Sequence, residues 1–162
     1  MCGIVAYLGP RNALPILVEG LRRLEYRGYD SAGVALRTPD GLWVRKKAGR
    51  VDDLAQLLQQ PPTTNAGIAH TRWATHGGVT DANAHPHLNG AADIAVVHNG
   101  IIENMSALKS ALEADGVVFA SETDTEVLPH LLAKVYAGDP VDAVRRTLAA
   151  VRGTYGVAVL FR

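Results

Sequence analysis

Cysteine is nearly absent from this chain of 162 residues, and the single one, Cys2, cannot form a disulfide within it. Long apolar runs are also missing, because no stretch of about eighteen apolar residues occurs and no basic segment leads into one. These absences argue against membrane insertion and secretion. Charge of one sign is not in excess, since sixteen lysines and arginines balance sixteen aspartates and glutamates. Without a bulk field to draw in nucleic acid or an anionic membrane, we expect a cytoplasmic protein.

The chain contains enough apolar sequence for the core of one domain over residues 1–162, since 48% of its residues are hydrophobic and 20% are charged. Short apolar runs alternate with helical patterns. Strands are predicted at 2–8, 33–38, 42–47, 67–71, 94–98, 117–120 and 155–161. Helices are predicted after Asn12, around 54–58, at 106–114, at 125–137 and after Asp139.

Several local signals refine these predictions. Asn12 and Asp139 are typical residues at a helix N-terminus, where a side-chain oxygen accepts a hydrogen bond from the backbone. Pro129 is expected to kink the helix in which it lies. The string from Ser121 to Glu126 resembles a capping box, in which a hydroxyl caps the helix and an acidic residue follows three positions later.

Cys2 is a candidate nucleophile. Removal of Met1 would leave a thiol and a free α-amine on the same residue. An α-amine has a reference pKa of roughly 7.7 to 8.0, so near neutral pH an appreciable fraction is an unprotonated base. Such a base can help to form the reactive thiolate. The alternative is a small buried hydrophobe that opens the first strand, and only the other residues can decide between the two.

Two further segments carry polar residues beyond what turns require. The string at 70–78 leaves a predicted strand; its Arg72 can clamp a carboxylate, and its Trp73 can exclude water. A surface arginine beside an anchoring tryptophan is the alternative. Asn99 and Gly100 are predicted to form a turn after the strand at 94–98, since Asn-Gly is a common turn signal. The same pair could form an oxyanion hole from a side-chain amide and an unobstructed backbone N–H.

Taken together, these strings resemble one family along nearly the whole chain. The matching strings stand at 2–5, 25–33, 70–77, 83–87, 98–104, 122–126 and 152–156. They are similar to the glutaminase domain of the glucosamine-6-phosphate synthases (glutamine:fructose-6-phosphate aminotransferases), which are class II glutamine amidotransferases. Asparagine synthetase and phosphoribosylpyrophosphate amidotransferase share the Met-Cys-Gly start, so they remain alternatives. They are less favoured because they are not known for the string at 72–77.

The resemblance implies a fold and a reaction. The fold would be α+β, an N-terminal nucleophile hydrolase-type sandwich of four layers in the order αββα. The reaction would be hydrolysis of the glutamine side-chain amide to glutamate and ammonia, without a cofactor. Cys2 would attack the amide, with its α-amine as base, and Asn99 with the Gly100 N–H would stabilise the oxyanion.

The resemblance also assigns the residues that bind substrate. Arg72 would hold the α-carboxylate of glutamine, Asp124 would hold its α-ammonium group, and Arg27 would support the surroundings of the nucleophile. The loop expected to close over glutamine contains Trp73, Thr75, His76 and Gly77. A module that binds glutamine without turnover is a further alternative, but this chain keeps both the nucleophile and the oxyanion donors.

A zinc site is the rival interpretation of the histidines. It would use His85, His87 and one of His70, His76 or His98. We expect no metal, because His85 and His87 flank a proline and no glutamate stands in a recognised zinc-hydrolase spacing.

The end of the chain departs from the family. The synthases continue into isomerase domains that hold the ammonia acceptor site for fructose 6-phosphate, and the full-length form is a possible homodimer. This chain stops directly on the strand predicted at 155–161. We therefore expect a glutaminase domain truncated at its C-terminus, with the isomerase domains absent.

Overall fold

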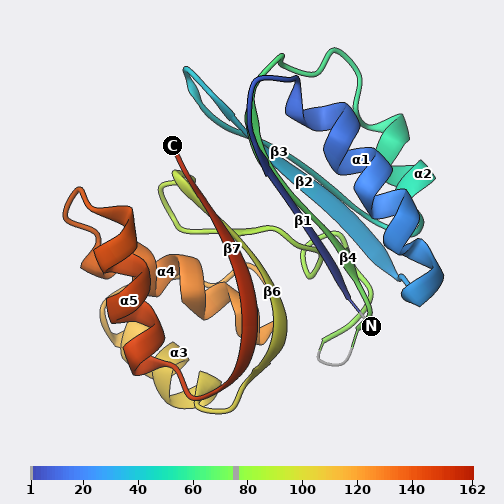
Figure 1. Ribbon diagram of the computed structural model, residues 1–162. Helices are drawn as coiled ribbons and strands as arrows, with labels where there is room; N and C mark the ends of the chain where they lie inside the picture. The colour runs from blue at the N-terminus through green and yellow to red at the C-terminus, as the bar shows by residue number, and fades with distance from the viewer. Residues whose placement is uncertain (1, 75–76) are drawn as a thin grey trace.

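Two antiparallel sheets stack face to face in the centre of the molecule (Figure 1). The computed structural model describes residues 2–74 and 77–162. In spatial order, the first sheet contains β1 (Gly3–Leu8), β4 (Ala66–Arg72), β2 (Ser31–Thr38) and β3 (Gly41–Ala48). The second sheet contains β5 (His87–Leu88), β6 (Ile94–Ile102) and β7 (Gly153–Phe161).

Helices cover the outer face of each sheet, so the domain has four layers in the order αββα (Figure 1). The first sheet carries α1 (Ala13–Leu24) and α2 (Val51–Gln56). The second sheet carries α3 (Met105–Ala114), α4 (Val127–Val135) and α5 (Pro140–Ala150). Two short 3-10 helices, η1 (Glu25–Arg27) and η2 (Asp124–Glu126), follow α1 and precede α4. No helix in the described part of the chain is long and apolar enough to cross a membrane.

The core follows from the sequence pattern. Leu14, Leu17 and Leu21 recur at helical spacing and bury one face of α1 against the first sheet. Strand β2 has six buried residues in succession, because α1 covers one of its faces and the second sheet covers the other. Small residues such as Ala35 and Ala95 line the space between the sheets, where they let the two layers approach closely.

The predicted strands and helices are present within a few residues of their expected bounds, with one exception. The segment 117–120 is not a strand. Its β-branched and aromatic residues favour an extended backbone, but the N–H groups of Ala120 and Ser121 donate to the Glu126 carboxylate at 2.8 and 2.7 Å. The Glu126 side chain thus accepts the backbone hydrogen bonds that a neighbouring strand would otherwise accept.

The cap predictions had mixed outcomes. Asp139 caps α5 as expected, since its carboxylate accepts from the Val141 N–H at 2.8 Å. Asn12 precedes α1, but its side chain makes no capping bond to the described residues. The capping box at 121–126 was wrong, because Glu126 reaches back to the chain before the helix instead. Pro129 lies in the first turn of α4, where its missing N–H removes no helical hydrogen bond.

The turn predicted at Asn99 and Gly100 was also wrong. Strand β6 continues through both residues to Ile102, and Asn99 and Gly100 pair with Gly156 and Tyr155 of β7. A partner strand from the end of the chain holds the pair extended. This difference decides how both groups are presented to the site.

Candidate functional site

Cys2 lies directly before β1, beside the end of β4. Gly3 pairs with Thr71 in the antiparallel ladder, so the start of β1 meets the end of β4. The Cys2 sulfur accepts a hydrogen bond from the Trp73 N–H at 3.2 Å and lies 3.7 Å from the Trp73 carbonyl oxygen. The thiol is therefore held at one end of the first sheet by the backbone that follows Arg72.

Asn99 reaches Cys2 from the second sheet. Its Nδ2 donates to the Cys2 carbonyl oxygen at 3.3 Å, and its Oδ1 lies 2.8 Å from Nε2 of His70. A side-chain amide nitrogen carries two hydrogens, so Nδ2 retains one for a further acceptor beside Cys2. Cys2 and a side-chain amide donor thus meet although 97 positions separate them in the sequence.

The register of β6 and β7 gives the direction of the Gly100 N–H. At the two ends of the ladder, Glu103 N donates to Arg152 O, and Arg162 N donates to Asp93 O. Because bonding alternates along an antiparallel pair, the N–H groups of even-numbered β6 residues point away from β7. The Ile102 N–H follows this rule and donates to the Asp124 carboxylate at 2.8 Å. The Gly100 N–H points to the same side.

Only glycine fits at position 100. Its φ of 143° lies in the region that side chains rarely adopt, and a Cβ there would stand 1.9 Å from the Thr154 carbonyl oxygen. The position therefore presents a backbone N–H without a side chain of its own.

Cys2 and Gly100 line one pocket whose walls also include a cation and an anion. Its walls include Cys2, Arg72, Trp73, Gly100, Thr123 and Asp124. Arg72, the last residue of β4, is 4% exposed and donates from Nη1 to the Gly78 carbonyl oxygen at 3.2 Å. Asp124 begins η2 and is held by Ile102. An arginine and an aspartate on one pocket suit a ligand that carries both a carboxylate and an ammonium group.

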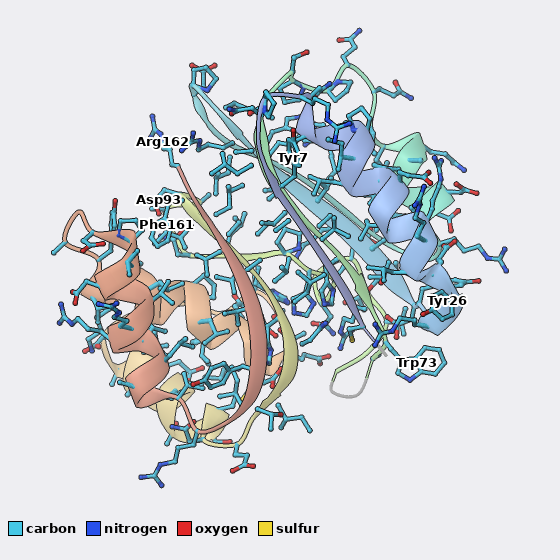
Figure 2. All side chains as sticks on the ribbon, in the orientation of Figure 1. Tyr7, Tyr26, Trp73, Asp93, Phe161 and Arg162 are labelled. Atoms are coloured by element: carbon cyan, nitrogen blue, oxygen red, sulfur yellow. The ribbon has the colours of Figure 1, made fainter. Side chains whose placement is uncertain are left out.

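The segment after Arg72 is anchored at its start by Asp30. The Asp30 N–H donates to the Arg72 carbonyl oxygen at 2.8 Å, and its carboxylate accepts from the Ala74 N–H. Gly28, with φ of 102°, leaves room for the Trp73 ring, which a Cβ would meet at 2.4 Å. Trp73 is 52% exposed, and Figure 2 shows it projecting outward at the end of the molecule where the chain begins. Asp30 was not among the predicted site residues.

Asn83 and Glu122 hold the far side of the same segment. Nδ2 of Asn83 donates to Gly78 O and to the Glu122 carboxylate, both at 3.0 Å, while Gly78 N donates to Glu122 at 3.2 Å. The Asn83 amide and the Gly78 N–H hold the pKa of Glu122 below its usual value. Gly77 lies beside this pair with φ of 75°. The sequence analysis did not identify this hydrogen-bonded pair, Asn83 and Glu122.

Not every described residue that was predicted lines this pocket: Asn99 and Gly77 are not among its walls, although Asn99 bonds to Cys2. Thr75 and His76 lie outside the described residues. Arg27 is half-buried in η1 and is not among the described residues that line the pocket.

A family model described as the glutamine amidotransferase domain matches residues 70–162, which is more than half of the chain. The chain belongs to the glutamine amidotransferase domain family. The match begins at His70, so it includes Arg72, Asn99, Gly100 and Asp124.

Curated relatives support a narrower placement of this amidotransferase domain. It is 60% identical over 160 residues to the glutamine–fructose-6-phosphate aminotransferase (isomerizing) of Thermus thermophilus, which covers 98% of this chain and 26% of the relative. The enzyme of that name from Symbiobacterium thermophilum is 58% identical over 161 residues, covering 99% of this chain and 26% of the relative. The chain therefore spans about a quarter of the length of these relatives.

Solved structures confirm the predicted fold class. The glutamine phosphoribosylpyrophosphate amidotransferase from B. subtilis complexed with ADP and GMP matches with a TM-score of 0.84 and 27% identity, covering 99% of this chain and 35% of that one. The allosteric regulatory enzyme of purine biosynthesis matches with a TM-score of 0.85. The amidotransferase domain is thus an α+β sandwich of the N-terminal nucleophile hydrolase type.

A row of buried histidines, His70, His85 and His87, reaches the pocket of this amidotransferase domain at His85, which is part of its wall. The rings of His70 and His85 are 4.2 Å apart, and those of His85 and His87 are 4.7 Å apart. Burial lowers the pKa of His70 to about 4 and that of His87 to about 3, and it lowers the pKa of His85 well below its ordinary value. All three rings are therefore neutral at pH 7.

Threonine hydroxyls bind one ring nitrogen of each of His85, His87 and His98. Thr125 Oγ1 lies 2.9 Å from both His85 Nε2 and His98 Nδ1, and Thr123 Oγ1 lies 2.9 Å from His87 Nε2. Over residues 2–74 and 77–162, no three His, Cys, Asp or Glu side chains are grouped to hold a metal ion. The histidines act instead as buried members of a hydrogen-bond network.

The buried histidines predict a loss of stability in mild acid. In the unfolded chain they bind protons near pH 6.5, whereas His70 and His87 resist protonation in the fold until about pH 4 and 3. Stability is therefore present above pH 6.5 and falls as the pH drops below it. By pH 5 each of the two should cost about 2 kcal/mol of the free energy of unfolding. Urea unfolding at pH 7 and pH 5 measures this change.

His87→Gln provides the matched comparison, because an amide can still bond to Thr123 but does not titrate. This variant should lose less stability than the parent between pH 7 and 5, by about the share of one histidine. An unfolding free energy that stays constant over this interval would contradict the neutral, buried state of these rings. Glu126, whose pKa is lowered to about 2 by the hydrogen bonds it accepts despite its burial, stabilises the fold fully above about pH 4.5, so it adds to the loss of stability only below that pH.

Proposed function

We propose that this chain hydrolyses the side-chain amide of glutamine to glutamate and ammonia, as the ammonia-supplying part of a glucosamine-6-phosphate synthase. The observation that carries the proposal is that Cys2 and Gly100 line one pocket, while the Asn99 amide nitrogen bonds to the carbonyl oxygen of the same cysteine. The 60% identity to a fructose-6-phosphate aminotransferase favours this assignment over a phosphoribosylpyrophosphate amidotransferase, for which the identity is 27%.

Removal of Met1 precedes the reaction and frees the α-amine of Cys2. In the first step this amine accepts the thiol proton, directly or through a water. The sulfur attacks the amide carbon, and the negative charge that develops on oxygen is met by Asn99 Nδ2 and the Gly100 N–H. Each such donor contributes roughly 3 to 4 kcal/mol in other acyl-transfer sites. The carbon–nitrogen bond then breaks, the amine returns the proton to the departing ammonia, and water hydrolyses the thioester to glutamate.

The two charged residues of the pocket select the substrate. Arg72 binds the α-carboxylate and Asp124 binds the α-ammonium group, so a free amino acid is preferred to an arbitrary primary amide. Arg27 supports the surroundings of Cys2. The loop that closes over glutamine consists of Trp73, Thr75, His76 and Gly77, with Asp30 and the Asn83–Glu122 pair as its anchors.

Conservative changes of the two charged residues test this selection. Arg72→Lys keeps the charge but loses the paired geometry, and Asp124→Asn keeps an acceptor for Ile102 but loses the charge. A hydrogen bond to a charged group is worth about 1.5 to 3 kcal/mol, so each variant should raise KM for glutamine roughly 10- to 150-fold. The value of kcat should change little, because both contacts exist before and during the reaction.

Initial rates of ammonia release over a range of glutamine concentrations measure both constants. Arg23→Lys is the matched control, since Arg23 is exposed and pairs with Glu19 on the surface of α1. An unchanged KM in both site variants would remove Arg72 and Asp124 from substrate binding.

The acceptor of the ammonia is part of the same proposal. The relatives extend well beyond the region that this chain spans, and their printed name, glutamine–fructose-6-phosphate aminotransferase (isomerizing), includes fructose 6-phosphate. We propose that the region beyond it forms isomerase domains. We place the acceptor site on such domains, and a homodimer is the proposed state of the full-length form.

A further inference from the structure

The side-chain amide of Asn99 can catalyse only in one of its two orientations. With Nδ2 toward the pocket, it offers a hydrogen to a developing oxyanion. Rotated by half a turn, it would present Oδ1, which repels a negative charge. A group that fixes this orientation is therefore as necessary to the site as the amide itself.

His70 is placed to fix it. The residue lies in β4, is fully buried, and holds Nε2 2.8 Å from Asn99 Oδ1. On the other side of the amide, Nδ2 donates to the Cys2 carbonyl oxygen. Since a backbone carbonyl only accepts, the nitrogen of the amide must face Cys2 and the oxygen must face His70.

The same bonds settle which nitrogen of His70 carries the proton. An amide oxygen only accepts, so His70 must donate through an Nε2–H. Its other nitrogen, Nδ1, is buried and makes no hydrogen bond of good geometry to a described residue, although the His98 backbone lies near the ring. An unpaired N–H is costlier to bury than an unpaired lone pair, so the neutral Nε2–H tautomer is favoured on both counts. Burial keeps the ring neutral at pH 7, because it lowers the pKa of His70 to about 4.

The ring itself cannot turn freely. His70 pairs with Gly33 on one side and Ile4 on the other, in the centre of the first sheet, and its ring packs against that of His85. A rotated Asn99 amide would meet the Nε2–H with its own NH2 group and the Cys2 carbonyl with its oxygen. Both contacts would be repulsive.

We propose that His70 is the positioning residue that holds the Asn99 amide with its nitrogen toward the oxyanion. The inference rests on the proposed function, and it assigns to His70 a role that acts only through Asn99. His70 bonds to Asn99 and is not among the described residues that line the pocket.

Two substitutions at position 70 separate the effect of losing the hydrogen bond to Asn99 from the effect of changing the side-chain volume. His70→Leu removes the donor, whereas His70→Gln retains an amide N–H that can reach Asn99. Because a typical hydrogen bond biases an equilibrium about tenfold, His70→Leu should lower kcat about tenfold while KM for glutamine stays within about twofold. His70→Gln should recover most of the loss. His87→Leu is the control for a buried histidine lost behind the site, and its kcat should remain near that of the parent.

A double-mutant cycle provides the decisive comparison. In an Asn99→Ala background the amide is gone, so His70→Leu should cause no further fall in kcat. A second tenfold fall in the double variant would show that His70 acts by another route and would overturn the proposal. So would a His70→Leu enzyme with unchanged kcat.

A spectroscopic measurement keeps the inference separate from the proposed function. In protein labelled with 15N at histidine, His70 should show a protonated Nε2 and an unprotonated Nδ1 at pH 7. The opposite tautomer, or a charged ring, would overturn the inference even in an active enzyme. Absence of glutaminase activity in the parent protein, together with the expected tautomer, would instead refute the proposed function and leave the hydrogen bond between His70 and Asn99 standing.

Discussion

Replacement of Cys2 by alanine is expected to abolish glutamine hydrolysis while leaving the fold intact. The proposed thioester forms on this sulfur, and removal of a nucleophile costs on the order of 10⁴- to 10⁶-fold in kcat in other acyl-transfer enzymes. The side chain is only partly buried and makes its hydrogen bonds with the Trp73 backbone. Its loss should therefore shift the thermal unfolding midpoint by only a few degrees.

Ammonia release, glutamine binding and thermal unfolding of the same preparation measure this prediction. The variant should still bind glutamine, because Arg72 and Asp124 remain. A cysteine with a merely structural role would give the opposite result, with lowered stability and retained turnover.

The same residue supplies a check on the proposed base. Preparations that retain Met1 have a peptide bond in place of the amine and should be inactive, so intact mass and activity should change together. Full activity in a preparation shown by mass to keep Met1 would exclude the amine as base.

Asn99→Ala is expected to lower kcat by about 100- to 1000-fold with little change in KM, as loss of one oxyanion donor does elsewhere. The donor contributes where charge develops, so its effect appears in the transition state and not in ground-state binding. Alanine is compatible with the extended backbone of β6. Gly100 offers no comparable test, since any side chain there collides with the Thr154 carbonyl oxygen.

Steady-state kinetics with glutamine measure this effect. Asn12→Ala is the matched control, because Asn12 is exposed and lies before α1, away from the site. A kcat within a few fold of the parent would mean that Asn99 is only a structural link between the sheets.

Local patterns were enough to predict most of the fold. The leucine spacing of α1 and the cap at Asp139 both depend on residues a few positions apart, and both are confirmed. The extended course of Asn99 and Gly100 depends on β7, more than fifty positions later, so the local turn signal prevailed in the prediction. Likewise, the Glu126 carboxylate replaces the partner strand that 117–120 would have needed.

The same distinction applies to the site. Cys2, Arg72 and Asn99 were named from short strings and from a family resemblance. The structure places Cys2 and Arg72 in the wall of one pocket and bonds Asn99 to the backbone of Cys2. The supporting residues were missed, because His70, Asp30 and Asn83 act on partners 29, 44 and 39 positions away. No pattern within a single string reports such contacts.

The pocket is divided between the two halves of the chain. The first sheet ends at Arg72 and the second begins at His87, so Cys2 comes from one half and Asn99 from the other. A cut in the connecting segment would give two complementary fragments, one with the nucleophile and one with the oxyanion donors. Ammonia release by such a mixture would require the fragments to assemble in trans, which makes this domain a natural candidate for a split reporter of protein association.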